Sequence, residues 1–165
     1  MGYTILIIVV IVLFIGAYVY KAKERSNFLA GGQIIQREKN FWDYSESFCV
    51  SKVTLDAVYN RFKTLLPDRS GFRYLHELQP DKNRIVINAM GMDNKCVATI
   101  DLVSTEDDIN TYKLTVHEMK YKNSGPNELL YNLLYTATEK TFLGFDPNVK
   151  VKTEYVDRKT KRSFF

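Results

Sequence analysis

The chain has 165 residues, of which 45% are hydrophobic and 25% charged, and a formal net charge of +4 at pH 7. This apolar content excludes an intrinsically disordered chain, and the length is sufficient for one domain with its own core. Only two cysteines, Cys49 and Cys96, are present. A disulfide-stapled fold is therefore excluded, and their predicted strand positions favour small buried side chains over a redox or metal pair.

The N-terminal segment is apolar from residue 3 to residue 20, where the sequence reads YTILIIVVIVLFIGAYVY without a charge. As a helix, this segment spans ~27 Å, which is close to the hydrocarbon thickness of a bilayer. Residues 1–24 are therefore predicted to be a retained transmembrane anchor. The lipid bilayer is the partner that we expect for residues 3–20.

Three other interpretations of this segment make demands that its residues do not meet. A cleaved secretory signal needs a basic start and a small-x-small cleavage site, whereas residues 17–19 read AYV. Myristoylation of Gly2 would need Ser or Thr at position 6, which is Leu6. A core helix would have a polar face, but this segment is apolar all round apart from Thr4.

Residues 2–6, GYTIL, resemble the processing site of type IV pilins, in which a glycine precedes an aromatic residue and an apolar helix. Those proteins carry a basic leader before the glycine and a glutamate five residues after it. Here Met1 alone precedes Gly2, and the glutamate position is Ile7. The resemblance therefore transfers no function to this chain.

Charge next to the span predicts its orientation. Lys21, Lys23 and Arg25 follow the apolar segment directly, and cytoplasmic flanks of spans are enriched in Lys and Arg. We therefore expect a single-pass signal-anchor with the N-terminus outside the cell membrane and the C-terminal domain in the cytoplasm.

Residues 25–46 are predicted to be a linker, with a helix break at Gly31 and Gly32. Phe41, Trp42 and Tyr44 form an aromatic cluster near its end. Such a cluster either packs onto the domain or contacts the membrane interface, and packing is favoured.

Residues 47–156 are predicted to be an α+β domain. A strand over 48–53 precedes a helix over 55–66, for which Thr54 is a natural N-cap. Alternating apolar residues then predict strands over 72–78, 85–89, 96–102 and 112–116, joined by turn-like segments in an antiparallel meander.

A second helix is predicted to open at Ser124-Gly125-Pro126, with Pro126 in its first turn, and to end at Gly144. Alternation over 149–155 then predicts an edge strand. The order β-α-β-β-β-β-α-β predicts a two-layer domain of antiparallel sheet with two helices. This order resembles the TATA-binding-protein-like arrangement and the helix-grip folds that hold apolar ligands, and the resemblance implies a fold without any binding residue.

No catalytic, cofactor-binding or metal-binding residue is predicted. His76 and His117 are each followed by a glutamate, and neighbouring residues on a strand point to opposite faces, which disfavours a metal site. The sequence contains neither a G-x-S-x-G motif nor a glycine-rich phosphate loop. Some carboxylates are candidates for a catalytic pair, although a solvated face is the more common role of such positions: Asp68, Glu77, Glu118 and Glu139.

Residues 157–165 are predicted to be a basic tail, for which contact with the membrane surface is a candidate role. From residue 149 onward six basic side chains stand against two acidic ones, an excess that equals the net charge of the chain. Basic residues bind anionic lipids and aromatic rings insert beside them, although a solvated tail is the more common role of such a segment and a nucleic-acid contact is a further alternative. The residues that carry this prediction are Arg158, Lys159, Lys161, Arg162, Phe164 and Phe165.

Together these features predict a membrane-anchored binding or interaction module whose partner is an unknown protein or an apolar ligand, with nucleic acid disfavoured. The eleven Tyr and ten Phe residues would either line a ligand cavity or fill the core. The alternative is a small membrane-associated hydrolase or transferase with an unrecognised site.

Overall fold

The computed structural model describes residues 2–31, 34, 37–66, 72–79, 82–90, 94–121 and 125–156. These residues form two compact units, Met1–Gln33 and Ile34–Phe165. The second unit thus begins inside the segment that the sequence suggests as a linker.

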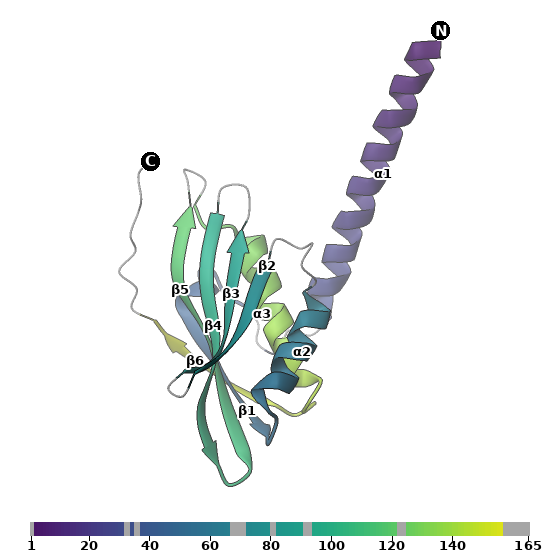
Figure 1. Ribbon diagram of the computed structural model, residues 1–165. Coiled ribbons are helices and arrows are strands. Elements are labelled where there is room, and N and C mark those ends of the chain that lie inside the picture. Colours follow the sequence, from purple (N-terminus) through teal and green to yellow (C-terminus); the bar gives the residue numbers. More distant parts are fainter. Residues whose placement is uncertain are drawn as a thin grey trace. The chain divides into compact units, whose positions relative to one another are not determined.

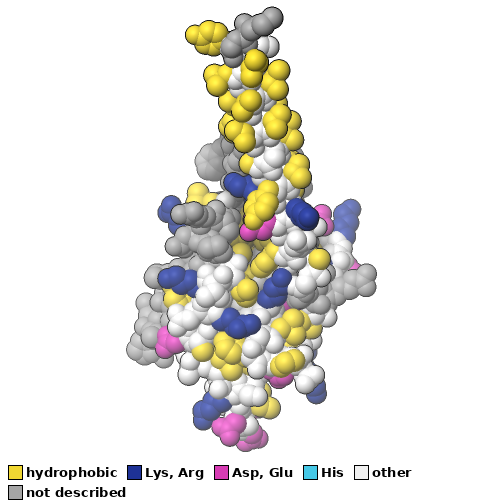
Figure 2. All heavy atoms as spheres, turned by 90° about the vertical axis from the view of Figure 1, so that its right-hand side faces the viewer, with side chains coloured by type: hydrophobic (Ala, Val, Ile, Leu, Met, Phe, Trp, Pro, Cys, Tyr) yellow, Lys and Arg dark blue, Asp and Glu magenta, His cyan; other side chains and the backbone are white. Residues whose placement is uncertain are grey.

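The helix of the first unit, α1 (Gly2–Ala30), is continuous over 29 residues. Its apolar side chains from Tyr3 to Tyr20 are all exposed, and hydrophobic side chains extend along it in Figure 2. The helix is long and apolar enough to cross a membrane, as predicted. It ends directly before Gly31, at the predicted break, because glycine disfavours the helical conformation.

The second unit contains one antiparallel sheet of six strands in the order β2-β3-β4-β5-β1-β6. Two helices, α2 (Leu55–Leu65) and α3 (Glu128–Leu143), cover the same face of this sheet (Figure 1). The predicted two-layer α+β architecture and its element order are confirmed. The strands are β1 (Tyr44–Ser51), β2 (Phe72–Gln79), β3 (Lys82–Met90), β4 (Asn94–Glu106), β5 (Ile109–Tyr121) and β6 (Lys150–Tyr155).

Strands β2 to β5 form the predicted meander, in which consecutive strands pair antiparallel. The hairpin between β4 and β5 closes with the pair Glu106 and Ile109. Asp107 and Asp108 form its two-residue turn with φ angles of 42° and 64°. Tight hairpin turns need such positive φ angles, and short polar residues such as aspartate tolerate them.

The observed N-cap of α2 is the one that the sequence predicts, whereas the observed start of α3 differs from the prediction. The Thr54 hydroxyl accepts a hydrogen bond from the amide of Ala57 at 3.3 Å, which confirms the predicted N-cap. At α3, however, Asn127 is the N-cap and accepts from the Leu130 amide at 3.1 Å. The helix therefore begins after Pro126 and not at it, because an Asn side chain satisfies the first-turn amides.

Strand β1 begins at Tyr44, four residues before the predicted start. Ser45, Glu46 and Ser47 hide this start in the sequence because they interrupt the apolar alternation. The strand is nevertheless regular here because β5 and β6 pair with its two edges. Strand β6 pairs with β1 and forms the predicted edge of the sheet.

The core lies between the sheet and the two helices and is rich in aromatic rings. Phe48 of β1 stacks on Phe142 of α3 with 4.4 Å between ring centroids, and Tyr112 of β5 lies 5.3 Å from the same ring. Val58 and Phe62 bring α2 onto this core and are fully buried. Burial of this apolar area is the main stabilising contribution to the unit.

Candidate functional site

The segment before β1, residues 34–43, is called the strap here, and residues 34 and 37–43 of it are described. Its last three residues form a 3-10 turn, η1 (Phe41–Asp43), after Asn40 in the left-handed conformation. Phe41 and Trp42 are buried, and the Phe41 ring meets Tyr135 of α3 edge-on at 5.3 Å. The predicted packing of these two rings onto the domain is confirmed, whereas Tyr44 is exposed.

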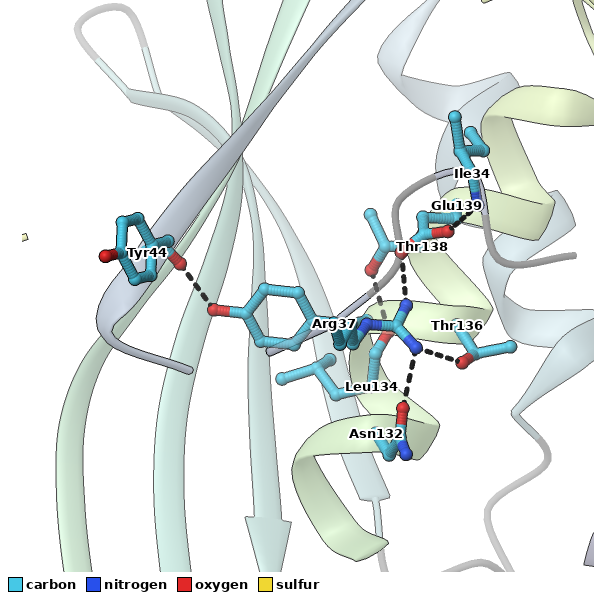
Figure 3. Close-up of polar contacts among 9 residues, drawn as sticks. Ile34, Arg37, Tyr44, Asn132, Leu134, Thr136, Thr138 and Glu139 are labelled. Carbon is cyan, nitrogen blue, oxygen red and sulfur yellow. Dashed lines mark hydrogen bonds and ion pairs between the residues drawn. The ribbon is translucent and has the colours of Figure 1, made fainter. Parts of the chain in front are cut away.

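Arg37 is the residue that fastens the strap to α3 (Figure 3). Its Nη1 donates to the side-chain oxygens of Asn132 at 2.6 Å and Thr136 at 2.9 Å. Its Nη2 forms an ion pair with Glu139. These three acceptors lie on one side of α3 because positions i, i+4 and i+7 of a helix share a face.

Aromatic rings complete the environment of Arg37. The guanidinium carbon lies 5.5 Å from the Phe41 ring centroid and 5.8 Å from that of Tyr135. Cations are attracted to the faces of aromatic rings, most of all when they are desolvated. The Arg37 side chain is only 5% exposed, so these rings replace part of its lost hydration.

Glu139 holds the strap at two points. One carboxylate oxygen pairs with Arg37, and the other accepts a hydrogen bond from the backbone amide of Ile34. The side chain is fully buried, so the sequence-based assignment of this residue to a solvated face is wrong. The strap covers the polar side of α3 and removes it from water.

A second buried carboxyl, that of Glu46 in β1, lies near this ion pair. The pKa of this carboxyl is raised from the ordinary value of 4.5 to about 8. Burial is the largest cause, the negative charge of Glu139 adds to it, and the positive charge of Arg37 opposes both. Among the described residues, its Oε2 has no hydrogen-bond partner. Glu46 is therefore mainly protonated at neutral pH, which leaves one positive and one negative charge in the cluster.

The hydroxyl of Tyr135 provides another bond between α3 and the start of β1. It donates to the carbonyl oxygen of Tyr44 at 2.6 Å (Figure 3). The strap, β1 and α3 are thus joined by charged, polar and aromatic contacts within one small region. We call Arg37, Glu46, Asn132, Thr136 and Glu139 the buried cluster.

The buried cluster is suited to fixing one arrangement of the chain. A buried ion pair is costly to desolvate and adds little net stability, but breaking it leaves a charge in a medium of low polarity. The strap is therefore restricted to the position in which Arg37 meets all three acceptors. Such burial also keeps these carboxylates away from a substrate in solution.

A second polar group lies on the outer face, which is the face of the sheet opposite α2 and α3. The Thr99 hydroxyl donates to Asp101 at 2.6 Å and lies 2.8 Å from Nε2 of His117, while Arg84 pairs with Asp101 at 2.9 Å. Since the Thr99 proton goes to Asp101, His117 must donate through Nε2. A catalytic triad needs the opposite arrangement, in which histidine takes the hydroxyl proton and aspartate orients the histidine.

The other sequence-predicted residues are distributed without forming a site. His117 and Glu118 are exposed on the outer face. Asp68, the side chains of His76 and Glu77, and the six tail residues from Arg158 to Phe165 lie outside what the structure describes. Within the described ranges, no group of three His, Cys, Asp or Glu residues is arranged to hold a metal ion.

The two cysteines differ in environment. Cys96 is buried in the core as predicted, but Cys49 is exposed on the outer face, so the prediction for that residue is wrong. Cys49 alternates with the core residues Phe48 and Val50 along β1 and therefore points the other way. A bridge between the two cysteines is excluded because they lie on opposite faces with β5 between their strands.

Sequence reasoning did not identify the buried cluster, although one signal for it is present. Asn132, Thr136 and Glu139 form a polar stripe on a helix whose other positions are mostly apolar.

Comparison with models of known protein families finds no match for this chain, and comparison with curated proteins finds none either.

Proposed function

We propose that this chain is a single-pass membrane protein in which α1 is a retained anchor and the α+β domain is a cytoplasmic binding or interaction module. The observation that carries the proposal is the fully exposed apolar surface of α1 between Tyr3 and Tyr20. An apolar surface of this size is unfavourable in water and favourable in lipid. The bilayer is therefore its partner.

The cytoplasmic orientation is supported by the basic residues that follow the apolar segment, Lys21, Lys23 and Arg25. We expect a reporter that works only in the cytoplasm to be active when it is fused after Phe165. An exported reporter at the same position should be silent. Activity of the exported reporter together with silence of the cytoplasmic one would reverse the proposed orientation.

A role in binding, rather than catalysis, is supported by the chemistry of the two polar groups. The carboxylates of the buried cluster are inaccessible, and His117 donates to the Thr99 hydroxyl and so does not take its proton. We expect detergent extracts to yield partners for the intact chain. The matched bait carries Arg37→Met, which loosens the strap, and partners lost with this bait would recognise the strap region.

The basic tail is the second membrane contact that we propose, and its support is compositional. Four Lys or Arg residues and two Phe residues lie between Arg158 and Phe165. Replacement of these four basic residues by Gln should weaken binding of a detached tail peptide to anionic vesicles. Equal binding of both peptides would contradict this role.

A further inference from the structure

The outer face of the sheet carries a clear excess of positive charge. The strand register places basic residues of five strands on this face together with fewer acidic ones. Seven described basic side chains stand against four acidic ones, a net charge of +3. The basic residues are Arg73, Arg84, Lys95, Lys113, Lys120, Lys150 and Lys152, and the acidic ones are Asp101, Glu106, Glu118 and Glu154.

The remainder of the domain has the opposite balance. Outside the outer face, the described residues from 34 to 156 include six basic and nine acidic side chains, a net charge of −3. Charges are thus segregated between the outer face and the rest of the domain. Such segregation creates a field that orients the domain near a charged surface.

The ion pairs of the outer face neutralise only part of its charge. Arg84 pairs with Asp101 at 2.9 Å, and Lys113 pairs with Glu154 at 2.7 Å. The hydrogen bond from Lys113 lowers the pKa of Glu154, so this carboxylate stays ionised. Lys152, by contrast, is 78% exposed and lies 3.5 Å from a carboxylate that Lys113 already binds.

The chemistry of this face fits lipid headgroups better than other polyanions. Its described neutral side chains are mainly Ser, Thr, Asn and Val, with Met90 and Ile109 as its large exposed apolar ones, and none of its described side chains is Phe, Tyr or Trp. Proteins that bind single-stranded nucleic acid stack bases on aromatic rings, and protein interfaces rely on aromatic anchors. A basic surface without such rings matches a layer of phosphate and carboxylate groups.

Attachment to the membrane makes even a weak contact effective. Thirteen residues separate Tyr20 from Ile34, so the domain begins at most ~50 Å along the chain from the apolar segment. A tether of this length keeps the domain at a high effective concentration beside the leaflet. Because the tether already holds the domain at the membrane, the basic charges of the outer face need only orient the domain on the leaflet.

We propose that the outer face of the sheet docks on the anionic phospholipid headgroups of the membrane that α1 spans. This proposal rests on the proposed function, since it needs α1 in the bilayer. Docking would turn the acidic, helix-bearing side of the domain toward the cytoplasm. That side is then the surface presented to protein partners.

Cys49 provides a native probe of this docking. It lies on the outer face, where it pairs in register with Lys150, and it is exposed, whereas Cys96 is buried in the core. The full chain is reconstituted in nanodiscs of phosphatidylcholine alone or with phosphatidylserine. The rate of Cys49 modification by a charged maleimide is then measured in both, with Cys49→Ser as the control for specificity.

Two matched variants each reverse three lysine charges, one on the outer face and the other elsewhere on the domain. The outer-face variant carries Lys95→Glu, Lys120→Glu and Lys152→Glu, and the control carries Lys39→Glu, Lys52→Glu and Lys63→Glu. All six lysines are exposed, so both variants should unfold close to the wild-type temperature. For each variant, the rate of Cys49 modification with phosphatidylserine is divided by the rate without it, and these ratios are compared. The ratio cancels any effect of the substitutions on the reactivity of the Cys49 thiol. Glutamine versions of both variants repeat the comparison if reversal impairs folding.

We expect phosphatidylserine to slow modification several-fold in the wild type and in the control variant, but not in the outer-face variant. High salt should remove the protection because it screens exposed charges. Equal rates in both lipids, with the chain integrated in the discs, would overturn docking and leave the anchor intact. Failure of α1 to integrate would instead overturn the proposed function. Protection by added tRNA or polyglutamate, without protection by phosphatidylserine, would assign the face to a soluble polyanion and overturn the proposal.

Discussion

Two ion pairs of this domain use the same chemical groups in opposite surroundings. Arg37 and Glu139 are 5% and 0% exposed, whereas Arg84 and Asp101 on the outer face are 31% and 22% exposed. Water and salt screen the second pair, and they do not reach the first. The buried pair therefore fixes a structure. The outer pair is half-buried, and it remains part of a surface that other molecules can meet; it is called the exposed pair below.

The comparison also explains why the two pairs tolerate change differently. Loss of one partner from the buried pair leaves a charge with neither water nor a counter-ion, which typically costs 3–5 kcal/mol. Loss of a partner from an exposed pair lets water take its place, at a typical cost of 0–1 kcal/mol.

The largest effect is expected for Arg37→Met, which keeps much of the side-chain volume and removes the charge. Glu139 then remains buried beside Glu46, and we expect unfolding to become easier by about 3–5 kcal/mol. Trp42, the single tryptophan, lies buried in the strap. Its emission should shift to the red as the strap detaches, while circular dichroism still reports an intact sheet.

The matched control for this change is Arg84→Met on the outer face, which should alter unfolding by less than about 1 kcal/mol. Combining Arg37→Met with Glu139→Gln should recover part of the loss, because Gln removes the buried charge and still accepts from the Ile34 amide. Similar losses for Arg37→Met and Arg84→Met would contradict the contrast between the two pairs.

The next effect is a dependence of stability on pH that originates in Glu46. Its pKa is about 8 in the folded chain and near 4.5 when unfolded, so unfolding releases a proton between these values. The stabilising contribution of protonated Glu46 is complete below pH 4.5 and is lost as the pH rises to about 8. Between pH 5 and pH 8 the free energy of unfolding should fall by about 3 kcal/mol.

Glu46→Gln should remove this slope and make the chain more stable than wild type near pH 8. The measurement is a series of urea titrations in mild detergent at each pH, followed by the emission of Trp42. Glu118→Gln is the control, because Glu118 is 59% exposed. A wild-type stability that is constant from pH 5 to pH 8 would show that Glu46 is ionised in the folded chain.

The sequence predicts the features that depend on local chemistry and misses those that depend on distant partners. The Thr54 cap, the Gly144 end of α3 and the meander follow from residues within a few positions of each other. Arg37 and Glu139 are 102 residues apart, so no local pattern relates them. The polar stripe of α3 has the composition of a solvated face, and only the strap that covers it makes it buried.

The start of β1 also depends on a distant part of the chain and not on the local sequence. Ser45, Glu46 and Ser47 would not form an isolated strand by alternation alone, but pairing with β6 extends the strand to Tyr44. Glu46 thereby reaches the core side of the sheet. Long-range pairing thus creates the buried carboxyl that the sequence does not indicate.

The smallest expected effect is the coupling energy between the two partners of the exposed pair. In a double-mutant cycle with Arg84→Ala and Asp101→Ala, we expect a coupling energy of about 0.5 kcal/mol that decreases as salt is added. The same cycle with Arg37→Ala and Glu139→Ala should give a coupling several times larger that salt hardly changes. A strong, salt-independent coupling on the outer face would mean that its charges are committed to the fold. They would then be poorly suited to meet headgroups, because each would have to leave a rigid partner before it could bind a lipid.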